Sequence, residues 1–172
     1  MEHCVEDLIR IFNNCFAHSY QTQLERGGDE PLYLPKDASR DYHVILFARG
    51  FFSSALHEVS HWLIAGEQRR LLIDYGYWYE PDGRTEQQQR LFEHVEVKPQ
   101  ALEWTLSNAC GFHFQLSVDN LNGEPGDSCQ FQELVYQQLQ KYAQDGLPLR
   151  AKIFRDALFQ FYRGLEPFSK AE

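Results

Sequence analysis

Apolar side chains recur every three or four positions in several segments of the chain, which is the pattern of amphipathic helices. The first of these segments is residues 4–18, where charged side chains separate the apolar positions. Two more lie near the end of the chain, around residues 131–139 and 153–161. The pattern therefore predicts helices at both ends of the chain.

Strand patterns are fewer and shorter than helical ones. Residues 44–48 (V-I-L-F-A) combine β-branched and aromatic side chains and follow a turn-rich stretch over residues 27–35, which predicts a buried strand. Residues 71–84 lose the helical period and become aromatic, as expected of a short strand pair or an ordered loop. The neighbours of Val118 are a further strand candidate.

A central helix is predicted to start at Ser53 or Ser54, to run to about Ile64 and to stop at Gly66. Helical signals return over residues 85–93 and again over residues 99–110, with Pro99 in a first helical turn. Several helices and two or three strands indicate one α+β domain over residues 1–172, predominantly helical with a small β-sheet.

Composition supports a single packed domain and excludes some functions. Of the 172 residues, 43% are hydrophobic and 15% aromatic, and no apolar stretch is long enough to cross a membrane. The formal charge of −9 argues against wide contact with nucleic acid. The N-terminus lacks the features of a secretory signal and the four cysteines are scattered, so we expect reduced thiols and a cytoplasmic location.

The candidate chemistry lies in the central helix, in the segment H-E-V-S-H that starts at His57. Because His57 and His61 are four residues apart on a helix, both imidazoles project from the same face and can reach one divalent metal ion. A third ligand is needed, and we choose Glu96 because an acidic side chain amid apolar neighbours requires a compensating charge. Glu93 is the competing residue, and Glu103 is a weaker one.

Two histidines and a glutamate do not select one reaction. The set fits zinc hydrolases, and it also fits the two-histidine, one-carboxylate iron sites that activate oxygen. In a zinc metallopeptidase Glu58 would act as the general base. In a metal-stabilised module without enzymatic activity, a fourth protein ligand such as His94 or His113 would close the site.

Several further motifs resemble the bacterial elongation factor P hydroxylase family. They occur in the same order as in that family, from near the N-terminus to about residue 120, and the last fifty residues are less diagnostic. The matching stretches are Asp29-Glu30-Pro31, Tyr33-Leu34-Pro35, Leu56-His57-Glu58-Val59-Ser60-His61-Trp62, Gly76-Tyr77-Trp78-Tyr79, Pro81-Asp82-Gly83-Arg84 and Val95-Glu96-Val97-Lys98-Pro99-Gln100-Ala101-Leu102.

This resemblance implies a cytoplasmic enzyme that hydroxylates the lysine-modified lysine of translation elongation factor P. The family's metal motif falls on His57 and His61, with Glu96 as our third ligand. The implied cofactor is Fe(II), with molecular oxygen as cosubstrate. Histidines one turn apart are also typical of zinc enzymes, so Zn(II) is the alternative metal.

Within that reading, Glu58 is the candidate catalytic residue, which would orient a ligand or hold a water molecule. The aromatic segment would supply a pocket rim in which ring faces and a carboxylate hold the ammonium groups of the substrate. The candidate substrate-binding residues are Tyr77, Trp78, Asp82 and Arg84.

Overall fold

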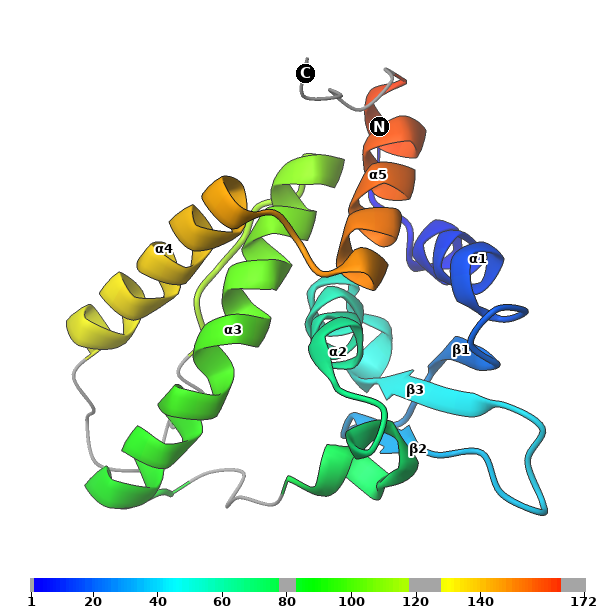
Figure 1. Ribbon diagram of the computed structural model, residues 1–172, viewed down its shortest axis with the longest axis horizontal. Coiled ribbons are helices and arrows are strands. Elements are labelled where there is room, and N and C mark those ends of the chain that lie inside the picture. Colours follow the sequence, from blue (N-terminus) through cyan, green and yellow to red (C-terminus); the bar gives the residue numbers. More distant parts are fainter. Residues whose placement is uncertain (1, 78–82, 118–127, 165–172) are drawn as a thin grey trace.

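The computed structural model describes residues 2–77, 83–117 and 128–164, and in this part of the chain five α-helices accompany a three-stranded sheet. The predicted α+β class with helix predominating is therefore confirmed. The helices are α1 (Val5–Phe16), α2 (Phe52–Ile64), α3 (Glu86–Cys110), α4 (Ser128–Asp145) and α5 (Leu149–Arg163). Figure 1 shows the sheet on one side of the molecule, α3 and α4 on the other, and α2 between them.

The sheet contains β1 (Thr22–Arg26), β2 (Leu32–Leu34) and β3 (His43–Phe47) in the order β1-β3-β2. β3 is the central strand and pairs parallel to β1 and antiparallel to β2, with Ile45 opposite Leu24 on one side and Tyr33 on the other. β3 confirms the strand predicted over residues 44–48. β1 was not predicted, because its sequence T-Q-L-E-R has only one large apolar side chain.

The main core is aromatic and lies where α1, α2 and α5 meet. Phe12 and Phe16 of α1 are completely buried, as are Trp62 of α2 and Phe154 of α5. Their rings contact one another at centroid distances between 4.9 and 6.2 Å. Burying an aromatic side chain of this size contributes about 2–3 kcal/mol, so this cluster holds α2 firmly from the side opposite α3.

α3 is a single helix of 25 residues, which corrects the prediction of two helices over residues 85–93 and 99–110. Thr85 forms a capping box with Gln88, and Gly111 ends the helix in a left-handed conformation. Pro99 lies inside the helix instead of in a first turn. It removes one backbone donor, but Ala101, Leu102 and Leu106 are completely buried on the same helix, and their packing outweighs the loss.

The ends of α2 also differ from the prediction. Phe51 occupies the N-cap position, and the Ser54 hydroxyl accepts a hydrogen bond from the backbone N–H of Ala48 before the helix. At the other end Ala65, in an extended conformation, stops the helix one residue before Gly66. The predicted glycine stop is therefore wrong, although the helix itself lies where the periodicity placed it.

The connection from α2 to α3 forms turns instead of strands in its described part. Two 3₁₀ turns, η2 (Arg69–Leu71) and η3 (Ile73–Gly76), follow α2, so an ordered loop is present over these residues. A third 3₁₀ turn, η1 (Ala48–Gly50), links β3 to α2. The strand proposed around Val118 lies outside the described residues. Within the described ranges no helix combines the length and apolar character needed to span a bilayer.

Candidate metal centre

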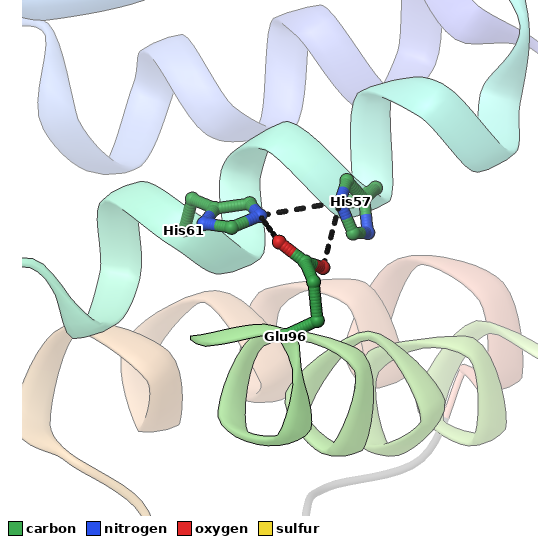
Figure 2. A group of neighbouring side chains, drawn as sticks. All are labelled: His57, His61 and Glu96. Atoms are coloured by element: carbon green, nitrogen blue, oxygen red, sulfur yellow. Dashed lines mark hydrogen bonds and ion pairs between the residues drawn. The ribbon is translucent and has the colours of Figure 1, made fainter. Parts of the chain in front are cut away.

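α2 and α3 lie side by side and bring three side chains of the predicted metal site together (Figure 2). The Nε2 atoms of His57 and His61 are 3.2 Å apart. Glu96 reaches across from α3, with Oε1 at 3.2 Å from His61 Nε2 and Oε2 at 3.4 Å from His57 Nε2. The two histidines and Glu96, which the sequence indicated as ligands, therefore lie together in one cluster.

The cluster is shielded from solvent and electrically coupled. The Glu96 side chain is 1% exposed, whereas those of His61 and His57 are 11% and 25% exposed. Burial by itself disfavours the charged form of Glu96, but His61 and His57 outweigh it and lower the carboxyl pKa to about 2. Burial likewise disfavours protonated His57, yet Glu96 and Glu103 raise the imidazole pKa to about 10.

The residues present fit a divalent cation. Metal bonds of about 2.0–2.2 Å to imidazole nitrogen and carboxylate oxygen place neighbouring ligand atoms about 3–3.5 Å apart, and the three separations here are 3.2, 3.2 and 3.4 Å. Both Glu96 oxygens are buried without a conventional hydrogen-bond partner among the described residues. Buried carboxylates in that condition normally coordinate metals or are paired.

Glu103 contacts the opposite side of the His57 ring. Its Oε2 lies 2.9 Å from His57 Nδ1, and the carboxylate is buried. A carboxylate that accepts from Nδ1–H fixes the imidazole tautomer and leaves Nε2 free to bind a metal ion. Glu103 was considered from the sequence only as a weaker ligand candidate. Its position two turns after Glu96 on α3 was the available signal, but it could not show which side of His57 each glutamate would reach.

Glu58 and Tyr75 lie beside the cluster. Burial raises the pKa of the Glu58 carboxyl group, and the negative charges of Glu96 and Asp74 raise it further. The two histidines have the opposite effect and lower this pKa. Tyr75 stacks on His61 at 6.3 Å and on Tyr33 at 4.3 Å between ring centroids. No sequence signal pointed to Tyr75.

The backbone that places Tyr75 is strained. Asp74 and Tyr75 both have positive φ values, 47° and 58°, in the left-handed region that non-glycine residues rarely adopt. The Asp74 carboxylate accepts a hydrogen bond from the backbone N–H of Tyr33 at 2.7 Å, which holds η3 against β2. Strain of this kind is often found at functional sites.

The remaining ligand candidates lie apart from the cluster. Glu93 accepts a hydrogen bond from Gln89 instead of facing the histidines. His94 is exposed and lines a pocket next to His61, and His113 is exposed at the end of α3. Among the described residues, the cluster of potential ligand atoms comprises His57, His61 and Glu96.

The structure describes two of the four predicted substrate-binding residues, and one of these two lines the pocket. Tyr77 is exposed and lines the pocket next to His61. Arg84 is completely buried, with its guanidinium over Phe92 at 3.8 Å and Nε donating to Gln89, and it is not part of the pocket lining. Trp78 and Asp82 lie outside the described residues.

Comparison with known proteins supplies a family match over nearly the whole chain. The model of the family described as elongation factor P hydroxylase matches residues 11–171. A protein of Haemophilus influenzae named elongation factor P lysine hydroxylase is 60% identical over 162 residues, which cover 94% of this chain and 91% of the relative. The similarity therefore continues past residue 120, where the sequence motifs became less diagnostic.

Proposed function

The chain belongs to the elongation factor P hydroxylase family, and from this we propose that it is an enzyme that hydroxylates translation elongation factor P on a lysylated lysine. Two independent lines support the proposal. The relative that is 60% identical is named elongation factor P lysine hydroxylase, and three side chains form a cluster that could bind a metal ion. A substrate of this kind also favours a cytoplasmic location.

We assign the metal ligands to His57, His61 and Glu96, and we favour Fe(II) over Zn(II) as the metal. Two histidines and one carboxylate are the ligand set of non-haem iron oxygenases, in which the reduced metal supplies the activation of dioxygen. Glu103 would hold His57 in the required tautomer. The ligands come from rigid helices, which keeps their relative positions fixed.

Substrate access would run through the pocket that His61 helps to line. The pocket has a volume of about 760 Å³, within the range of small-molecule sites and large enough for a long side chain. We assign Tyr77 to substrate binding at this pocket, and Glu58, beside the two histidines, to orienting a water molecule or the substrate's ammonium group. The low exposure of Glu96 and His61 would limit the access of water to the proposed metal site.

The convergence of His57, His61 and Glu96 carries the proposal, and it can be tested directly. Protein loaded anaerobically with Fe(II) and then given oxygen and a reductant should add the mass of one oxygen atom to lysylated elongation factor P. Unmodified factor should gain little or none. No added oxygen on the lysylated factor, with metal bound, would refute the proposed activity.

A matched pair of variants tests whether activity and metal binding depend on the cluster. His61→Ala removes a proposed ligand, and we expect loss of activity and of bound metal. His113→Ala removes an exposed histidine outside the cluster and should retain both. Equal losses in the two variants would show that the cluster has no special part in the reaction.

The H-E-x-x-H helix leaves a zinc peptidase as the second candidate, because Glu58 is the motif residue that would act as the general base. That activity predicts peptide cleavage by Zn(II)-loaded protein and its loss in Glu58→Gln. The family match favours the hydroxylase. Cleavage of elongation factor P without added oxygen would reverse this order.

A further inference from the structure

The pocket beside His61 is assembled from five parts of the fold. Its described lining comes from the end of α2, the η2–η3 turns, the middle of α3, α4 and the residue Pro148 just before α5. Its described lining includes His61, Tyr75 and Tyr77, together with Lys98 of α3 and Lys141 of α4. Because one lining residue is a proposed metal ligand, the pocket is the approach to the metal centre.

The charged side chains in the described lining of this pocket are all cationic. They are Arg69 of η2, Lys98 of α3 and Lys141 of α4, and all three are exposed. The chain as a whole has a formal charge of −9. A group of cations from three separate elements around one opening is therefore opposite in sign to the molecule that carries it.

None of these three cations is neutralised by a carboxylate within the part of the chain that the structure describes, and the same is true of Lys36 and Lys152. Arg69 is nevertheless held in place: it lies over the Tyr77 ring at 4.2 Å and donates to the carbonyl oxygen of Tyr75 at 3.0 Å. Surface arginines that do pair with a carboxylate are Arg10, Arg26, Arg40, Arg49, Arg90 and Arg155.

The position of the three cations bears on what can approach the pocket. Because they are exposed and belong to three elements around one site, they attract anionic groups on an approaching partner. Acidic side chains around the group that enters the pocket would therefore be held close to Arg69, Lys98 and Lys141.

We propose that Arg69, Lys98 and Lys141 form a docking rim for acidic side chains on the protein substrate, around the modified lysine. This inference rests on the proposed function, which supplies a protein as the partner and an ammonium-bearing side chain as the group that enters. The acidic surface of the enzyme repels an acidic partner elsewhere, so the docking rim orients the encounter as well as strengthening it.

Charge reversal tests the docking rim without disturbing the core, because all three side chains are exposed. Lys98→Glu and Lys141→Glu should each raise the KM for lysylated elongation factor P by about 3- to 10-fold, with kcat little changed. The double variant should raise it further and should remove most of the increase in KM that added salt causes in the wild type. Lys36→Glu, the same charge change in the exposed loop after β2, is the matched control and should leave KM near the wild-type value.

A compensating change in the partner makes the test reciprocal. Acidic residues of elongation factor P near the modified lysine, changed to lysine, should raise the KM of the wild-type enzyme and restore that of Lys98→Glu or Lys141→Glu. If the wild type is active and the two reversals behave like Lys36→Glu, the docking rim is refuted while the proposed function stands.

Two further outcomes would lead to different conclusions. An inactive wild type would refute the proposed function, and the docking rim with it. If the reversals leave the KM for the factor unchanged but abolish inhibition or activation by a free organic acid such as succinate, the cations hold a small carboxylate instead. That result would overturn the docking proposal.

Discussion

His57 is held between two glutamates of α3, with Nδ1 2.9 Å from Glu103 Oε2 and Nε2 3.4 Å from Glu96 Oε2. The two carboxylates are seven residues apart on the same helix and contact opposite nitrogens of one ring. This arrangement fixes which nitrogen faces His61. In the proposed site Glu96 would bind the metal ion and Glu103 would orient His57.

Replacing Glu103 should weaken metal binding without removing a ligand. We expect Glu103→Ala to lower the affinity for Fe(II) or Zn(II) by about 10- to 100-fold, as is typical when the hydrogen-bond partner of a metal-binding histidine is lost. Glu103→Gln, which keeps an acceptor oxygen, should recover part of the loss. Competition with a chromophoric chelator measures both. Unchanged affinity in Glu103→Ala would contradict the orienting role.

Glu96 and Glu93 lie three residues apart on α3 and should differ completely in metal binding. Glu96→Ala removes a proposed ligand, so bound metal should fall well below one ion per chain. Metal should then no longer raise the melting temperature. In the wild type, metal at 100 times its dissociation constant should increase the free energy of unfolding by about 2.7 kcal/mol. Glu93→Ala should retain both the bound metal and the rise in melting temperature that metal causes. Metal analysis and thermal melting measure these two properties, and their loss in Glu93→Ala would contradict the prediction.

The raised pKa of His57 predicts how the stability of the metal-free protein depends on pH. A group whose pKa is raised from 6.5 to about 10 on folding stabilises the fold fully below pH 6.5, and the contribution is lost as pH rises through 10. The free energy of unfolding of the wild type minus that of His57→Gln should therefore shrink between pH 6.5 and 10. Urea denaturation in the presence of a chelator measures it, and a difference independent of pH would exclude this linkage.

Two stacked tyrosines should respond oppositely to loss of their hydroxyl groups. The Tyr75 hydroxyl is buried without a partner among the described residues, whereas the Tyr33 hydroxyl donates to the carbonyl oxygen of Arg70 at 2.8 Å. Tyr75→Phe should raise stability by about 1 kcal/mol, and Tyr33→Phe should lower it by about 1 kcal/mol. Denaturant titration of both variants tests this. Destabilisation by Tyr75→Phe would indicate that its hydroxyl is hydrogen-bonded in solution.

The parts of the fold that sequence predicted are those in which local pattern and packing agree. α1, α4 and α5 have apolar residues at helical spacing and form where that spacing placed them. The same holds for α2, so the sequence alone is enough to place the histidine pair on one helical face. Glu96 could be selected because its apolar neighbours already indicated burial.

Other features depend on contacts between distant segments. β1 exists because it pairs with β3 and because Asn13 of α1 accepts a hydrogen bond from the backbone N–H of Leu24 at 2.8 Å, neither of which its polar sequence reveals. Pro99 reads as a helix start, yet the buried side chains that follow it keep α3 continuous. Tyr75 reaches His61 through two residues with positive φ, a conformation that propensity disfavours and tertiary contacts stabilise.

The connection between α2 and α3 contributes to the pocket wall but none of the three proposed ligands. If the pocket admits the substrate as proposed, exchange of this segment between homologous enzymes would change which polypeptides are accepted and leave the three proposed ligands in place. The same division offers a route to engineering: new target proteins could be sought by varying residues 66–77 and the outer surface of α4 while His57, His61 and Glu96 stay constant.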